Sequence, residues 1–134
     1  MYLLDTDTIV YSLKGEGYVH EHLRRHRTDL LHLSVITLME LYFGAYRSKK
    51  VDANLAKIRT LEDSFSILQV GSEIASVFGS LKASSYSKGQ PLDDFDLAIA
   101  ATALAHNLCV VTNNEKHFRK IPGLKFENWF KKPI

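Results

Sequence analysis

The sequence DDFDLAIAATALAHNLCVVT, residues 93–112, carries the signals of a helix that leads directly into a strand. Asp93 or Asp94 can cap the helix N-terminus, alanines fill its interior, and Asn107 suits its end. The apolar run at 108–112 predicts a buried strand. A helix joined to a buried strand in this way is typical of an α/β protein with a parallel sheet.

The same alternation of helices and strands extends over the rest of the chain. Short apolar runs predict further strands, and helical patterns fill the segments between them. The predicted strands are residues 2–5, 30–34, 66–70 and 124–129, and the predicted helices are 34–47, 51–65, 71–88 and 114–121. We therefore expect an α/β fold with a mostly parallel central sheet that is covered by helices on both faces.

Length and composition are those of an ordinary globular domain. The chain has 134 residues, of which 46% are hydrophobic and 24% charged, and no linker divides it, so we expect residues 1–134 to form a single domain. No signal peptide or apolar span of membrane length is visible, which favours a cytoplasmic location and no membrane partner. Cys109 is the one cysteine and lies in an apolar run, so it is expected to be a buried core thiol.

Positive charge is local rather than general. The formal net charge is only +2, yet the basic residues cluster at 24–27, 47–50, 116–120 and 131–132. Such clusters permit a polyanionic partner, although each by itself is equally typical of a solvated helix face.

Three acids from separate segments are candidates for one metal site. Asp5 ends the first predicted strand, Glu40 lies in the helix after the second, and Asp96 lies in the first turn of the 93–107 helix. A parallel sheet brings strand ends to one edge, and two carboxylates about 5 Å apart repel by roughly 3 kcal/mol unless a cation or a proton intervenes. An all-oxygen set of this kind suits Mg²⁺ or Mn²⁺.

Each acid also has a purely structural interpretation. Glu40 with Thr37 forms a capping-box pattern, and Asp96 would favour the positive end of its own helix. Asp5 could cap the helix that follows it. The three acids together, in this order, favour a shared site over three separate caps.

Three other functions are compatible with parts of the sequence. Asp5-Thr6-Asp7-Thr8 fits the signature of haloacid-dehalogenase-like phosphatases, with Asp5 as nucleophile and Asp7 as acid. His22 and His26 have the spacing of a zinc pair, although nothing completes the site and a solvated helix is the stronger interpretation. A non-catalytic module that binds nucleic acid or protein is the last alternative.

Four stretches together resemble the PIN-domain ribonucleases, and among them the VapC toxins of toxin–antitoxin pairs. They are LLDTDTIVYSL, SVITLMELYFGA, DDFDLAIAATALAHNLCVVTNNEKHF and IPGLKFENW, which cover almost the whole chain. The resemblance implies a three-layer α/β/α sandwich and an Mg²⁺- or Mn²⁺-dependent endoribonuclease. It also implies a homodimer and a small VapB-type antitoxin whose tail enters the acidic pocket.

The resemblance also implies roles for particular residues. Asp5, Glu40 and Asp96 match the three principal acids, and Asn114 stands where the family often has a fourth. The supporting residues would be Thr6, Thr112, Asn113 and Asn114, with Asp94 or Glu115 as possible additions to the site. Asp7 is expected to cap the helix that begins beside it, outside the metal site.

Overall fold

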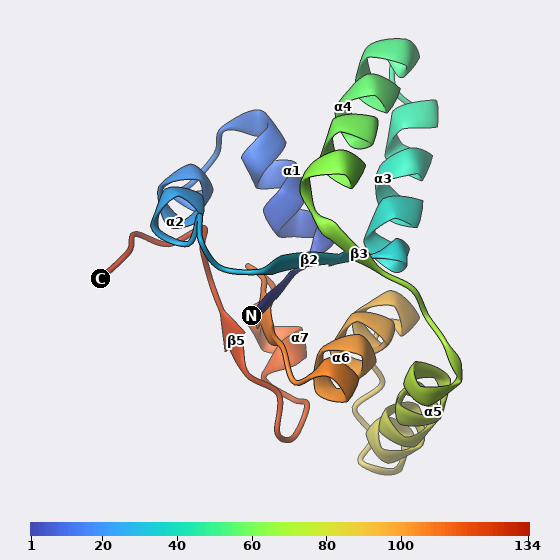
Figure 1. Ribbon diagram of the computed structural model, residues 1–134. Coiled ribbons are helices and arrows are strands. Elements are labelled where there is room, and N and C mark those ends of the chain that lie inside the picture. The colour runs from blue at the N-terminus through green and yellow to red at the C-terminus, as the bar shows by residue number, and fades with distance from the viewer.

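The computed structural model describes residues 1–134 and is built around a five-stranded sheet. The strand order is β3-β2-β1-β4-β5, and every neighbouring pair is parallel (Figure 1). The strands are β1 (Tyr2–Leu4), β2 (Leu31–Ser34), β3 (Ser66–Leu68), β4 (Cys109–Val111) and β5 (Phe126–Glu127). The parallel sheet predicted from the sequence is confirmed.

Seven helices cover the two faces of this sheet (Figure 1). They are α1 (Thr6–Lys14), α2 (Val19–Arg25), α3 (Val35–Tyr46), α4 (Val51–Ser64), α5 (Ser72–Ser87), α6 (Asp94–His106) and α7 (Glu115–Phe118). Side chains alternate across each strand, so Leu4 packs under α1, α3 and α4 while Leu3 packs against α6. Two apolar clusters result, one on each face, and the α/β/α sandwich is confirmed.

Most predicted elements are present but shorter than expected. The largest difference is the last strand, predicted over 124–129, of which only Phe126–Glu127 pairs with β4. The caps of α6 match their prediction, because the Asp93 carboxylate accepts from the backbone N–H of Phe95 and Asn107 adopts a left-handed φ of 53°. An apolar pattern shows which residues are buried, but it does not show where hydrogen-bonded pairing with the neighbouring strand ends.

The chain after β5 is held against α2 by an aromatic stack. Trp129 is fully buried, and the rings of His22 and His26 lie nearly parallel to its ring at centroid distances of 5.5 and 4.8 Å. His22 Nε2 also lies 2.8 Å from the carbonyl oxygen of Lys131, and His26 Nδ1 lies 2.6 Å from Asp29. The two histidines therefore pack the C-terminal segment and do not form a zinc pair.

Cys109 departs from its predicted place in the core. Its side chain is half-buried beside Glu127 and belongs to neither apolar cluster. Burial and the neighbouring carboxylate raise the pKa of this thiol to about 11, so the thiolate is scarce near neutral pH.

None of the helices combines the length and the apolar character needed to cross a membrane.

Replacing Trp129 with alanine should destabilise the protein by about 3–5 kcal/mol, because the change leaves a cavity in place of the fully buried indole between α2 and the sheet. Urea unfolding followed by circular dichroism measures this. Trp129→Phe keeps a ring in the stack and should cost much less. Equal stability of the alanine variant and the parent would show that the stack does not anchor the C-terminal segment.

Candidate functional site

The carboxyl ends of β1 and β4 form the crevice of the sheet. The chain passes from β1 outward to β2 and β3 on one side, and then crosses to β4 on the other side of β1. In open parallel sheets, ligands bind at such a reversal of strand order, outside the carboxyl ends of the strands. Asp5 directly follows β1, and Thr112, Asn113 and Asn114 directly follow β4.

A pocket of about 530 Å³ opens at this crevice. Its lining contains four carboxylates and no lysine, arginine or histidine. The lining residues are Asp5, Thr6, Asp7, Val10, Tyr11, Glu40, Asp96, Asn113 and Asn114. The structure thus brings the three predicted acids into one pocket, together with three of the four predicted supporting residues.

Asp5 is the most deeply buried of these acids. Its carboxylate accepts from the backbone N–H of Thr6 at 2.8 Å, capping α1, and from the Thr112 hydroxyl at 2.9 Å. Thr112 therefore supports the site from beneath the pocket. Burial, followed by the negative charges of Asp7 and Asp96, raises the pKa of Asp5 to about 7 despite these two hydrogen bonds.

Glu40 reaches the pocket from α3. The Thr6 hydroxyl donates to Glu40 Oε1 at 2.6 Å and so links α1 to α3. The capping-box alternative is wrong, because Ser34 caps α3 by accepting from the Ile36 N–H at 3.0 Å. Burial, with a further contribution from the charge of Asp96, raises the pKa of Glu40.

Asp96 enters the pocket from the first turn of α6. The Asp93 carboxylate caps this helix, which leaves the Asp96 side chain free to meet His117, whose Nδ1 lies 2.7 Å from Asp96 Oδ2. Asn114 Nδ2 lies 2.7 Å from the same ring nitrogen, so His117 links Asp96 to the segment after β4 and orients its carboxylate. The sequence reading missed His117. The only signal for it was its position three residues after Asn114 on the short helix α7.

Asp7 corrects an expectation, because it does not cap α1. Asp5 occupies that position, and Asp7 lies inside the first turn, where its Oδ2 accepts from the Asn113 N–H at 3.1 Å and its Oδ1 from the Thr8 hydroxyl at 3.3 Å. Burial raises the pKa of Asp7 as well. Asp7 is thus a fourth acid of the pocket, tied to the segment after β4.

The two optional acids lie outside the pocket. Asp94 points away on α6 and pairs with Lys82 at 3.0 Å. Glu115 pairs with Lys131 at 2.7 Å and with Arg119 at 3.1 Å. Both carboxylates already have basic partners, whereas the four in the pocket have none from lysine or arginine.

The donor set of the pocket fits a hard divalent cation. All its candidate ligand atoms are oxygens or side-chain amides, and no basic side chain balances the four carboxylates. No three His, Cys, Asp or Glu side chains are grouped tightly enough to hold a metal ion by themselves. Mg²⁺ is compatible with a wider arrangement, because it keeps several waters and needs only one or two direct carboxylate ligands.

Comparison with known proteins gives the family of the chain. The model of the PIN domain matches residues 2–124. The chain belongs to the PIN domain family. It is 34% identical to the tRNA(fMet)-specific endonuclease VapC of Salmonella typhimurium over 96% of this chain and 97% of that protein. It is 32% identical to ribonuclease VapC2 of Rickettsia felis over 98% and 99% of the two chains.

Solved structures give the same result. The chain matches a crystal structure of VapBC2 from Rickettsia felis bound to a promoter DNA fragment, with a TM-score of 0.89 and 32% identity over 96% of this chain and 98% of the other. It matches DNA-bound VapBC from Salmonella typhimurium with the same TM-score and identity, over 96% and 97%. The family resemblance inferred from the four sequence stretches is confirmed, and it favours a nuclease over the phosphatase alternative.

Asp5 should make stability depend on pH. Because its pKa is raised from 3.8 to about 7, the folded state retains a proton that the unfolded state loses, so stability falls as pH rises through this interval. In buffer without divalent cations, Asp5→Asn should therefore raise the free energy of unfolding near pH 8 by on the order of 1–3 kcal/mol. Thermal unfolding of both proteins between about pH 4 and pH 8 measures this, and parallel pH profiles would contradict the assignment.

Proposed function

We propose that the protein is a metal-dependent endoribonuclease that acts as the toxin of a VapBC-type pair. The observation that carries the proposal is the pocket at the β1–β4 crevice, where four carboxylates meet without a basic side chain. The similarity to VapC ribonucleases over almost the full length of the chain supports the choice of RNA as substrate.

Asp5, Glu40 and Asp96 would together hold Mg²⁺ or Mn²⁺, one or two of them directly and the rest through bound waters, with Asp7 beside them. The bound cation supplies a water of lowered pKa and positive charge beside the scissile phosphate. Thr112 and Thr6 hold Asp5 and Glu40 by their hydroxyl groups, and His117 holds Asp96. The ligands are thus oriented before substrate arrives. Asn113 and Asn114 line the same pocket, where Asn113 Nδ2 donates to the Tyr11 hydroxyl at 3.1 Å and Asn114 Nδ2 lies 2.7 Å from His117 Nδ1.

The pair Asp96 and Asp94 provides a matched test, because both are in the first turn of α6 but only Asp96 lines the pocket. Asp96→Asn should lower Mg²⁺-dependent RNA cleavage by roughly 100-fold or more, and Asp94→Asn should stay near the parent rate. Gel assays with and without EDTA measure this. Cleavage that survives EDTA, or equal losses in both variants, would reject the metal-site assignment.

The chemistry of the product ends follows from the attacking group. A divalent cation held by the acids would lower the pKa of a bound water beside the scissile phosphate, so water is the expected nucleophile. Products should carry a 5′-phosphate and a 3′-hydroxyl. End-group analysis by mass spectrometry detects these, and 2′,3′-cyclic phosphates would overturn the mechanism.

A groove beside the pocket is the proposed binding site of a VapB-type partner. This groove, about 400 Å³ in volume, lies between α1, α3 and α4 and shares Thr6, Val10 and Glu40 with the acidic pocket. The similar structures from Rickettsia felis and Salmonella typhimurium are of VapBC complexes. A VapB-type antitoxin lying in this groove would block access to the acids, and we expect a short neighbouring reading frame to encode it.

A larger side chain at Gly44 would occupy part of this groove and so tests whether the partner binds there. A Cβ at Gly44 on α3, within the groove, meets nothing within 4 Å, and the same holds for Gly79 on α5, outside it. Gly44→Leu should weaken binding of the VapB-type partner at least about tenfold, while Gly79→Leu should not. Calorimetric titration measures both, and equal affinities would place the partner elsewhere.

A homodimer remains part of the proposal. Met39, Phe43 and Tyr46 form a stripe of exposed apolar side chains on α3, at spacings of four and three residues. An exposed apolar stripe of this kind is suited to burial against a second copy.

A further inference from the structure

Three hollows follow one another along the surface from the acidic pocket to α2. The second hollow, of about 490 Å³, is lined by three basic side chains, Arg25, Lys131 and Lys132, and by Asn128 and two acids, Glu115 and Glu127, of which Glu115 pairs with Lys131. It adjoins the acidic pocket where Asn128 donates to Asn113 Oδ1 at 2.9 Å. The third hollow, of about 540 Å³, is lined by Glu21, Arg24, Arg25, Arg27 and Thr28, so Arg25 belongs to both.

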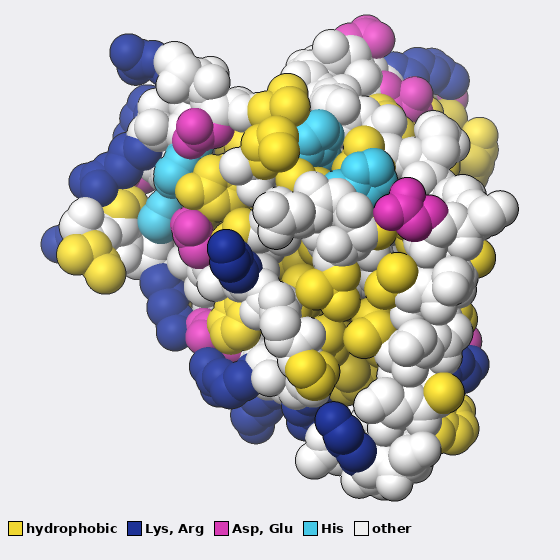
Figure 2. Space-filling view, turned by 60° about the horizontal axis from the view of Figure 1, so that its bottom comes forward, with side chains coloured by type: hydrophobic (Ala, Val, Ile, Leu, Met, Phe, Trp, Pro, Cys, Tyr) yellow, Lys and Arg dark blue, Asp and Glu magenta, His cyan; other side chains and the backbone are white.

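Basic groups on this surface are largely unpaired. Arg24, Arg27 and Lys132 form no ion pair, and Arg25 donates only to the main-chain oxygen of Ile134 at 3.0 Å. In Figure 2, Lys and Arg side chains gather along the left edge, the side on which α2 and the C-terminus lie in Figure 1. Their charge is therefore available to an external polyanion.

Exposed aromatic rings lie at the N-terminal end of α2 and in the segment after β5, next to the two basic hollows but outside their linings. Tyr11, on the rim of the acidic pocket, packs against Phe130 with ring centroids 4.6 Å apart. Phe130 is 36% exposed and Tyr18 43% exposed, and the Tyr18 N–H donates to the Phe130 carbonyl at 3.1 Å. Gly17, at a φ of 64°, lets the Phe130 ring sit against the backbone, where a Cβ would come within 2.5 Å of it.

The acidic pocket creates a need for such a surface. Four carboxylates exceed the charge of one divalent cation, so the pocket by itself attracts a phosphodiester weakly, and affinity gained elsewhere would favour binding. Positive grooves lined with exposed aromatic rings bind single strands, because arginines contact phosphates while bases stack on the rings. An acidic peptide would match the charge but would not use the rings.

We propose that the surface formed by Arg24, Arg25, Arg27, Lys132, Tyr18 and Phe130 binds a single-stranded segment of substrate RNA beside the scissile phosphate. This inference rests on the proposed function. The surface supplies affinity and the pocket supplies chemistry, so damage to the surface raises KM and leaves kcat unchanged.

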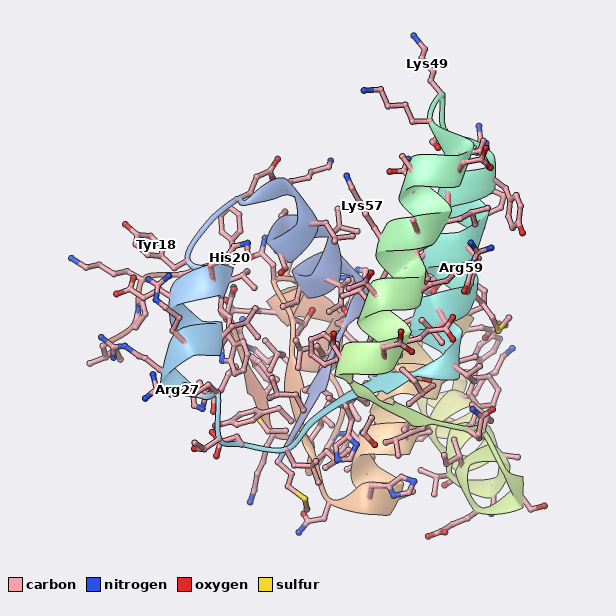
Figure 3. All side chains as sticks on the ribbon, turned by 45° about the horizontal axis from the view of Figure 1, so that its top comes forward. Tyr18, His20, Arg27, Lys49, Lys57 and Arg59 are labelled. Atoms are coloured by element: carbon pink, nitrogen blue, oxygen red, sulfur yellow. The ribbon has the colours of Figure 1, made fainter.

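Two double variants with equal charge loss provide the test. Arg24→Ala/Arg27→Ala removes two unpaired charges from the surface, and Lys49→Ala/Lys50→Ala removes two from the turn between α3 and α4. Figure 3 shows Arg27 beside α2 and Lys49 at the tip of that turn, at separate ends of the molecule. The probe is a fluorescent single-stranded RNA of about 12 nucleotides, measured by anisotropy in EDTA on an Asp5→Asn background.

The arginine double variant should bind this RNA about five- to tenfold more weakly, with a salt slope smaller by about 1.4, while the lysine double variant stays near the parent. In cleavage assays, made with Asp5 intact and Mg²⁺ present, the arginine double variant should show a raised KM and an unchanged kcat. Tyr18→Ala should weaken RNA binding about fivefold, and Tyr18→Phe should restore it.

The outcomes separate this inference from the proposed function. Equal effects of the two double variants, or none, would overturn the binding surface even if Mg²⁺-dependent cleavage is found. Polyglutamate that competes as well as RNA would identify an acidic-peptide site and also overturn it. Selective RNA binding by a protein that cleaves no RNA would keep the surface and reject the nuclease.

Discussion

The burial of Asp5 between β1 and β4 is the constraint on which the rest of the site depends. The Asp5 N–H donates to the Val111 carbonyl at 2.9 Å, its carboxylate caps α1, and the Thr112 hydroxyl binds the same carboxylate. The Thr8 hydroxyl, one turn into α1, donates to the Val111 carbonyl as well. One acidic residue thus joins the central strand, the first helix and the neighbouring strand, and its charge has no basic partner in the pocket.

The other acids are held by groups that stiffen them without neutralising them. Hydroxyls and backbone amides hold Asp5, Glu40 and Asp7, and only Asp96 meets an ionisable group, His117. The raised pKa values of Asp5, Asp7 and Glu40 arise first from burial, which disfavours carboxylate charge. A folded chain that keeps buried carboxylates together gives up stability, which is the pattern expected at a functional site.

Charge is arranged in opposite ways at the two ends of the proposed substrate path. The acids converge on one crevice, whereas unpaired arginines and a lysine surround the chain segment after β5. The small net charge of +2 conceals this separation, because the sum cancels while the local fields do not. Trp129 stacks on α2, and Phe130 packs against Gly17 and against Tyr11 of α1, so the C-terminal segment is held to both helices.

The sequence by itself determined the fold class and predicted three of the four acids that meet in the pocket. Alternating helices and strands require a parallel sheet, parallel strands bring their carboxyl ends to one edge, and Asp5, Glu40 and Asp96 lie in or next to those segments. Tertiary structure alone decided the role of Asp7, the contact of His117 with Asp96, and the stacking of His22 and His26 on Trp129. These depend on which side chains from distant segments meet, and sequence periodicity carries only the local backbone pattern. Asp5 and Asp7 show the difference, because either could cap a helix by its local sequence. In the folded protein Asp5 caps α1 and accepts from Thr112, whereas Asp7 accepts from the N–H of Asn113 in the segment after β4.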